Sequence, residues 1–187
     1  MDCDSIGEHT IIAGGDQGCD PHQEGFGPLR AHETIIIDIF PRDERSGYYG
    51  DLTRTVCKGA APEEARRLYQ TVLAAQQLGL DQIRPGAQGH EIHQSIQQFF
   101  IEAGYETGER DGFMQGYFHG TGHGLGLEIH EGPSIGRRED QLVAGHIVTV
   151  EPGLYYRDLG GVRIEDTVVV REGGYENLAT LPKVFEV

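Results

Sequence analysis

Four acidic residues interrupt the most β-prone segments of this sequence. Asp38 lies inside the apolar run ETIIIDIF and Asp51 directly precedes LTRTV, while Glu151 ends GHIVTVE and Glu165 follows GVRI. Carboxylates are depleted in strands, and a buried charge costs several kcal/mol unless a partner compensates it. Any fold of this chain must therefore bring these four acids to compensating positive charges.

Arginine is one such partner, and Arg54 and Arg163 lie in the same segments. Two arginines serve four acids poorly, and carboxylates brought together cannot all ionise without a cation. Two divalent ions roughly 3.5–4 Å apart can be held by four acids and one imidazole. His123 is the best candidate for that imidazole, because the glycines on both sides of it in GTGHGLG allow the backbone and a metal ion to approach each other closely.

Composition limits the class of protein. The chain has 187 residues with 37% hydrophobic residues, which suits one globular domain with a core. Its formal charge of −15, from 30 acidic and 15 basic residues, excludes nucleic acid and anionic membranes as expected partners. No apolar run approaches the roughly 20 residues of a membrane span. The 3 cysteines form no CxxC pair and no signal peptide is evident, so we expect free thiols and a cytoplasmic location.

The hydrophobic pattern predicts two β-hairpins separated by two helices. The predicted strands are a short one at 9–14, two that pair as the first hairpin at 33–40 and 48–59, and two that pair as the second at 145–153 and 160–174. The predicted helices run from Pro62 to about Ile83, before the Pro85-Gly86 break, and over about 88–103. A polar loop is expected at 14–31. Each hairpin carries two of the four acids, which indicates a faint duplication whose first copy lacks its helices.

Four motifs in this order resemble one enzyme family. They are DIF…YYGDLTRT, FHGTGHGLGLEIHEGP, VTVEPGLY and GVRIED. Together they are similar to the prolidase and aminopeptidase P branch of the pita-bread metallopeptidases, from about residue 10 to the C-terminus. The resemblance implies an α+β pita-bread (creatinase/aminopeptidase) fold, with pseudo-twofold helix-hairpin halves around a curved antiparallel sheet, here without the first helix pair. It also implies a single catalytic domain over 1–187, shortened at its N-terminus and without a separate N-terminal domain.

The resemblance implies a dinuclear metal site. Its ligands would be Asp38, Asp51, His123, Glu151 and Glu165, with Asp51 and Glu165 bridging both ions. The two divalent ions would be manganese, cobalt, zinc or iron, with manganese favoured.

The same resemblance implies roles for further residues. Glu151 would pass the proton of the attacking water to the leaving nitrogen, and His130 would contact the scissile peptide and steady the developing oxyanion. His119 is typical of the proline-directed branch, and His22 would lie near the substrate as a further catalytic group. Arg163 would pair with the metal-binding acids and help to hold the substrate.

The implied function is hydrolysis of Xaa-Pro bonds by a hydroxide that bridges the metals. The substrate would be a peptide with proline at its second position, and the enzyme an Xaa-Pro aminopeptidase or Xaa-Pro dipeptidase. An inactive fragment or a peptide-binding module of the same fold is the alternative, and a methionine aminopeptidase is a further one. A homodimer, the native metal and the substrate length are left open.

Five histidines lie outside these motifs. The sequence predicts surface or loop positions for them: His9, His32, His90, His93 and His146.

Overall fold

The structure, a computed structural model, describes residues 3–5 and 10–187, with side chains from residue 10 onward. Both predicted helices are present, as α1 (Glu63–Leu80) and α2 (Gly89–Glu102). The strands of the described residues are β1 (Cys3–Ser5), β2 (Ile11–Gly14), β3 (Thr34–Ile39), β4 (Arg42–Asp43), β5 (Leu52–Cys57), β6 (Gly108–Arg110), β7 (Phe113–Gln115), β8 (Gly122–Gly124), β9 (Glu131–Ile135), β10 (Ile147–Val150), β11 (Gly153–Tyr156), β12 (Gly160–Arg163), β13 (Asp166–Arg171) and β14 (Gly174–Asn177).

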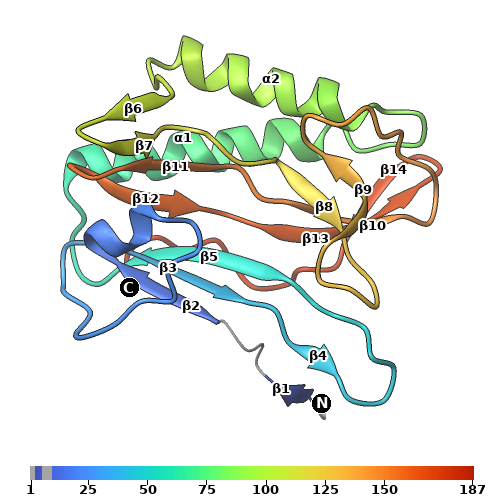
Figure 1. The fold of residues 1–187 in the computed structure, drawn as a ribbon, viewed down its shortest axis with the longest axis horizontal. Coiled ribbons are helices and arrows are strands. Elements are labelled where there is room, and N and C mark those ends of the chain that lie inside the picture. Colours follow the sequence, from blue (N-terminus) through green and yellow to red (C-terminus); the bar gives the residue numbers. More distant parts are fainter. Residues whose placement is uncertain (1–2, 6–9) are drawn as a thin grey trace.

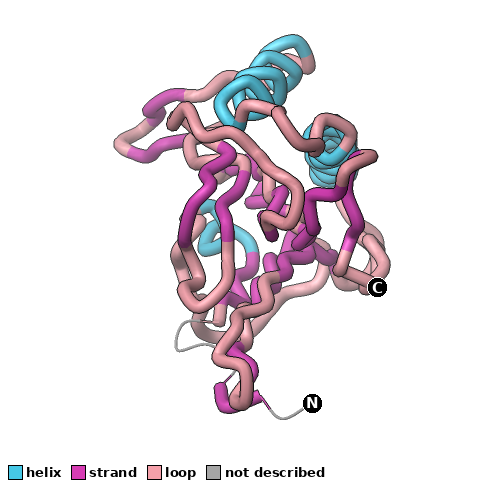
Figure 2. The backbone as a smooth tube through the Cα atoms, turned by 90° about the vertical axis from the view of Figure 1, so that its right-hand side faces the viewer, coloured by secondary structure: helices cyan, strands magenta, loops and turns pink. Residues whose placement is uncertain are grey.

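Antiparallel sheets form the body of the molecule. The first hairpin is confirmed as β3 and β5, which pair along six residues each, with β2 on the other side of β3. The larger sheet has the order β14-β13-β10-β8-β9, and β11 pairs with β12 beside it. Both helices lie on the same side of these strands, and the β2-β3-β5 sheet lies at the opposite side (Figures 1 and 2).

The second hairpin differs from its prediction because its return strand is broken. The residues expected as one strand at 160–174 form β12 and β13, which are separated by Ile164 and Glu165. The outgoing strand breaks at the same level, between β10 and β11, where Pro152 has no N–H to donate to the ladder. This double break is the feature of the fold on which the site depends.

The helices pack by the apolar stripe that their periodicity predicts. Buried side chains of α1 such as Leu68, Tyr69 and Val72 join those of α2 such as Ile96 and Phe100 in one core over the large sheet. The predicted end of α1, at about Ile83, is later than the observed one. The helix stops at Leu80, and Ile83 lies beyond it yet remains buried.

The predicted loop at 14–31 is partly helical. Its first part forms a 3₁₀ helix, Gly15–Cys19, which packs against β12. A Cβ atom on Gly161 would lie 1.8 Å from the carbonyl oxygen of Gly18, so the two backbones touch. This contact anchors the segment that leads to His22.

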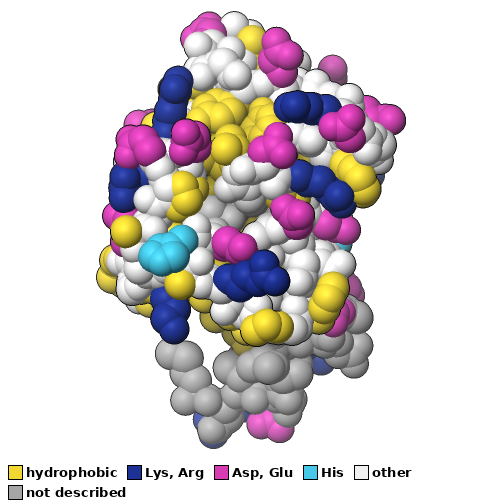
Figure 3. Space-filling model, turned by 90° about the vertical axis from the view of Figure 1, so that its left-hand side faces the viewer, with side chains coloured by type: hydrophobic (Ala, Val, Ile, Leu, Met, Phe, Trp, Pro, Cys, Tyr) yellow, Lys and Arg dark blue, Asp and Glu magenta, His cyan; other side chains and the backbone are white. Residues whose placement is uncertain are grey.

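The outer surface agrees with the composition. On the face shown in Figure 3, acidic and basic side chains alternate and no broad basic surface is visible. None of the described helices is long and apolar enough to span a bilayer. Before β3, the described residues contain the 3₁₀ helix Gly15–Cys19 and no α-helix.

Candidate active site

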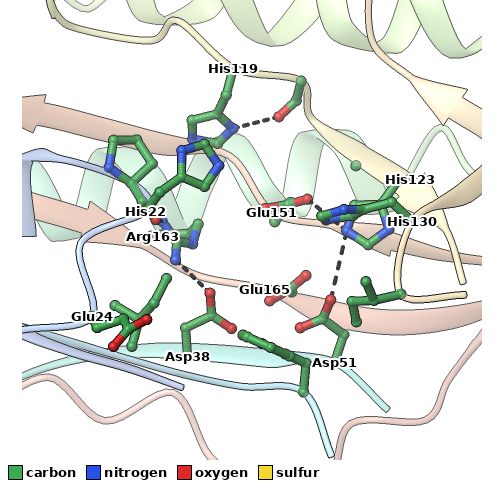
Figure 4. A pocket seen from close by; sticks show the side chains of 16 residues that line it. His22, Glu24, Asp38, Asp51, His119, His123, His130, Glu151, Arg163 and Glu165 are labelled. Carbon is green, nitrogen blue, oxygen red and sulfur yellow. Dashed lines mark hydrogen bonds and ion pairs between the residues drawn. The ribbon is translucent and has the colours of Figure 1, made fainter. Parts of the chain in front are cut away.

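A cavity of about 590 Å³ opens between the first hairpin and the glycine-rich segment 118–133. Its volume is typical of small-ligand sites in proteins. All nine site residues predicted from the sequence line it (Figure 4): His22, Asp38, Asp51, His119, His123, His130, Glu151, Arg163 and Glu165.

The double break in the second hairpin places two of the acids. The backbone N–H of Glu151 leaves the ladder and donates to the carbonyl of Thr121, at 2.7 Å. The N–H of Glu165 donates instead to the carbonyl of Thr53 in β5, at 3.1 Å. The two glutamates therefore join the second hairpin to the glycine-rich segment and to the first hairpin.

The first hairpin places the two aspartates. Asp38 lies directly opposite Thr53 in the β3–β5 register, and Asp51 directly precedes β5. Thr53 also donates its hydroxyl proton to a carboxylate oxygen of Glu165, at 2.7 Å. The strand alternation thus turns polar side chains of an otherwise apolar hairpin toward one cavity.

Glycines let the backbone carrying His123 approach the sheet. A Cβ atom on Gly122 would lie 2.0 Å from the carbonyl oxygen of Thr149, and one on Gly124 would lie 2.3 Å from that of Gly132. The glycines at these two positions therefore bring the backbone of β8 into contact with that of β10 and β9.

The orientation of the His123 ring follows from its contacts. Its Nδ1 lies 3.1 Å from the carbonyl oxygen of Gly124, which can only accept, so Nδ1 carries a proton. Its Nε2 lies 3.3 Å from a carboxylate oxygen of Glu151 and 3.7 Å from one of Asp51. The ring is therefore held with the atom that suits a metal directed at the carboxylates.

Burial, reinforced by the neighbouring acids, raises the pKa values of three carboxyl groups. Burial, together with Asp38 and Glu151, raises the pKa of Asp51 to about 8. Burial and the neighbouring acids also hold the pKa of Glu165 well above its ordinary value. Burial raises the pKa of Asp38 as well, although Arg163 opposes this effect.

Glu151 and His123 behave as an ion pair. Burial would raise the pKa of Glu151, but the hydrogen bond and positive charge of His123, together with His119 and Arg163, outweigh it and lower the pKa to about 2. Burial would lower the pKa of His123, and the carboxylates of Glu151 and Asp51 help to bring it above its ordinary value instead.

These residues suit a divalent cation. Ligand atoms of Asp51, His123 and Glu165 all lie within 4.8 Å of one another. One carboxylate oxygen of Asp38 is buried without a hydrogen-bond partner, while its other oxygen accepts from Arg163 at 2.6 Å. A cation would relieve both the repulsion and the unsatisfied oxygen, and carboxylate and imidazole donors are what such ions accept.

A hydrogen-bonded chain crosses the wall of the cavity from His119 to Asp38. Nδ1 of His119 faces the Gly120 carbonyl at 2.7 Å, so it carries the ring proton, and Nε2 accepts from the hydroxyl of Tyr155 at 2.8 Å. That hydroxyl accepts from Arg163 at 3.0 Å, and Arg163 pairs with Asp38. Burial lowers the pKa of His119 to about 4, so its ring is neutral at pH 7.

His22 and His130 are the exposed histidines of the cavity. His130 stands edge-on to the ring of His123, with centroids 4.3 Å apart. Burial, followed by the charge of His123, lowers the pKa of His130. Within the described residues, neither ring makes a hydrogen bond to the protein, which leaves both able to contact a ligand.

Sequence reasoning missed three residues that hold the site. Thr53 and Tyr155 lie within the recognised motifs but carry no signal of their own. His93 was predicted at the surface or in a loop, which is wrong. It is buried in α2 and lies 2.9 Å from the hydroxyl of Thr121 and 3.0 Å from that of Tyr117, where it supports the segment between His119 and His123.

Comparison with known proteins agrees with this geometry. The pattern of metallopeptidase family M24 matches residues 1–172. The chain belongs to metallopeptidase family M24. This M24 chain is 35% identical to an Xaa-Pro dipeptidase of Pyrococcus furiosus over 90% of its length, and 41% identical to an uncharacterized peptidase of Bacillus subtilis over 96%.

Solved structures show the same fold. An X-Pro aminopeptidase from Thermotoga maritima superposes with a TM-score of 0.88 at 34% identity and covers 99% of this chain. The prolidase from Pyrococcus furiosus gives 0.83 at 35% identity and covers 93%. The predicted pita-bread fold is thereby confirmed. The M24 chain spans about half the length of these relatives, 46% of the dipeptidase and 51% of the aminopeptidase.

We predict that Gly122→Ala destabilises the protein and weakens metal binding. The added methyl group would press on the Thr149 carbonyl and displace the segment carrying His123, at a cost of about 1–3 kcal/mol. Urea unfolding and calorimetric titration with Mn²⁺ measure the two effects. Gly120→Ala is the control, because its nearest neighbour would be an oxygen at an ordinary 3.5 Å. Equal losses in both variants would contradict the close-approach argument.

We also predict that Asp51→Asn stabilises the protein in the presence of a chelator, most strongly at high pH. The folded-state pKa of Asp51, about 8, lies above the ordinary 3.8, so the folded wild type holds this proton and loses stability as pH rises from 4 to 8. Asparagine does not titrate. The free energy of unfolding of the variant should therefore be about 1–3 kcal/mol higher than that of the wild type at pH 8 and little changed at pH 4. Urea unfolding with EDTA across this range tests it, and two parallel pH profiles would refute it.

Proposed function

We propose that this chain is a dinuclear, metal-dependent exopeptidase that hydrolyses Xaa-Pro peptide bonds. The observation that carries the proposal is the convergence of four carboxylates and one imidazole in a cavity with two further histidines at its opening. An inactive peptide-binding module would have no need to gather so many mutually repelling acids.

We assign the metal ligands as Asp38, Asp51, His123, Glu151 and Glu165. Bound divalent ions would polarise the scissile carbonyl and lower the pKa of a water, and they would neutralise the crowded carboxylates. The donor set of oxygen and nitrogen atoms accepts several metals, and manganese is the first we would test.

The other residues of the cavity act on the peptide. Glu151 accepts the proton of the attacking water and delivers it to the leaving nitrogen. His130, at the opening, donates a hydrogen bond to the oxygen on which negative charge develops. His22 contacts the substrate from the opposite side of the cavity, and Arg163 and His119 hold the wall against which the substrate lies.

Proline specificity is supported by the names of the relatives, which include an Xaa-Pro dipeptidase and an X-Pro aminopeptidase. The two cysteines whose side chains are described, Cys19 and Cys57, are free, buried thiols, which suits a reducing cytoplasm, and we propose that location. The activity proposed is that of the whole protein, and this chain spans about half the length of the relatives.

A substrate panel tests the proposed reaction. With Mn²⁺ supplied, we expect turnover of Xaa-Pro dipeptides or of longer Xaa-Pro peptides, and none of matched peptides with alanine in place of proline. Release of the first residue is measured by chromatography. Preferential cleavage of peptides with N-terminal methionine would instead indicate a methionine aminopeptidase, and no turnover of any peptide would favour a binding module.

We further predict that Glu151→Gln lowers kcat at least about 100-fold while Mn²⁺ still binds, because the amide offers an oxygen but takes no proton. Turnover and calorimetric titration are measured on the same preparation. Glu128→Gln, an exposed position on the neighbouring segment, is the matched control and should keep full activity. Undiminished turnover in Glu151→Gln would remove Glu151 from the reaction.

A further inference from the structure

We propose that Arg54 and Asp166 are positioning residues, which hold the carboxylate of Glu165 at the metal centre from outside the cavity. The inference rests on the proposed function, because it concerns the same metal site. Neither residue lines the cavity.

Two dipeptides face each other here, Thr53-Arg54 in β5 and Glu165-Asp166 at the start of β13. On the inner side, the hydroxyl of Thr53 donates to the carboxylate of Glu165 at 2.7 Å. On the outer side, Nη2 of Arg54 donates to the carboxylate of Asp166 at 2.8 Å. Successive side chains of a strand point to opposite faces, so the first pair reaches the cavity and the second lies behind it.

The guanidinium of Arg54 also ties the two backbones together. Its Nη1 donates to the carbonyl of Thr53 at 2.9 Å and to the carbonyl of Glu165 at 2.5 Å. These are the two residues whose side chains meet inside the cavity. A shift of the guanidinium would therefore move both partners of the inner hydrogen bond.

Asp166 is anchored in turn by the C-terminal segment. The residue is 0% exposed, and its second oxygen accepts from Nζ of Lys183 at 2.6 Å and from the amide of Asn177 at 2.8 Å. Nη2 of Arg54 also donates to the carbonyl of Leu181, at 2.7 Å. The segment 177–183 therefore binds both members of the outer pair, Arg54 and Asp166.

This arrangement does more than fill volume. A buried ion pair is a weak source of stability, since apolar residues of similar size often serve as well or better. What apolar residues could not supply is the set of directed hydrogen bonds to the carbonyls of Thr53 and Glu165. Groups that orient metal ligands typically change metal affinity 10–100-fold when replaced.

The test measures Mn²⁺ affinity in Arg54→Lys and Asp166→Asn by calorimetric titration. Lysine keeps the positive charge but cannot bridge two carbonyls and a carboxylate, and asparagine keeps the shape of Asp166 without its charge. We expect affinity about 10–100-fold weaker in both. The control is Glu186→Gln, which loosens an exposed ion pair with Arg66 (2.8 Å) on the same C-terminal segment and should keep wild-type affinity.

A purely structural role gives a different result. Thermal unfolding in EDTA and circular dichroism are recorded for each variant, and folded variants with wild-type affinity overturn the proposal. If both variants fail to fold, Lys183→Met replaces them, because it removes one partner of Asp166 at a partly exposed position. That variant should bind Mn²⁺ at least about 3-fold more weakly, and unchanged affinity overturns the proposal.

Failure of the proposed reaction is recognised separately. If the wild type binds Mn²⁺ but cleaves no Xaa-Pro peptide, the substrate assignment falls and the positioning role is still decided by affinity. If the wild type binds no divalent ion, the positioning role falls with the metal centre. In an active enzyme, the variants should regain kcat when Mn²⁺ is raised to saturation, and a loss of kcat that persists there contradicts an action through metal binding.

Discussion

Repulsion among buried carboxylates is the interaction on which the rest of this structure depends. Four acids of two hairpins line one cavity, and among the described residues one imidazole and one guanidinium are the cationic groups that directly contact them. Burial and this imbalance together raise the pKa values of Asp51 and Glu165. A fold that tolerates it must be held firmly elsewhere, and the helix-covered core over the large sheet does so. The same imbalance makes the cavity a site for divalent cations, so the local cost in stability and the proposed chemistry have one cause.

The site is assembled by backbone contacts more than by regular strands. A continuous second hairpin would send its amide groups across its own ladder. The break at Pro152 and at Ile164 releases the N–H groups of Glu151 and Glu165, which bind the glycine-rich segment and β5 instead. Glycines in the neighbouring segment bring its backbone near enough to accept such bonds. Behind the cavity, the guanidinium of Arg54 likewise donates to backbone carbonyls, those of Glu165 and Leu181. It thereby connects the two hairpins to the C-terminal segment.

Much of this could be predicted from residues alone, and the failures have identifiable reasons. The runs around Asp38 and the apolar stripes of both helices have clear periods, so their strands and helices are found close to where they were expected. The division of 160–174 was missed because its sequence is β-prone throughout, and the interruption is imposed by partners in other segments. His93 was misplaced because its environment is made by Tyr117 and Thr121, which follow it by 24 and 28 residues. Tyr155 was missed for a similar reason, since its value lies in bonds to His119 and Arg163.

The sequence by itself determined that the negative charges of four acids had to be compensated, because a charge in an apolar strand is costly wherever that strand lies. It also indicated the glycine-flanked His123 as a fifth ligand of the compensating ions. Through its resemblance to a known family it also indicated the pita-bread fold and nine of the sixteen residues that line the cavity. Only the tertiary structure decided which nitrogen of His123 faces the acids, which oxygen of Asp38 is left without a partner, and which residues stand behind Glu165. Those properties depend on contacts between residues that are far apart in the sequence, such as Asp51 and His123 or Thr53 and Glu165. Local sequence carries no record of such distances, because hydrogen bonds are specified by position in space and not along the chain.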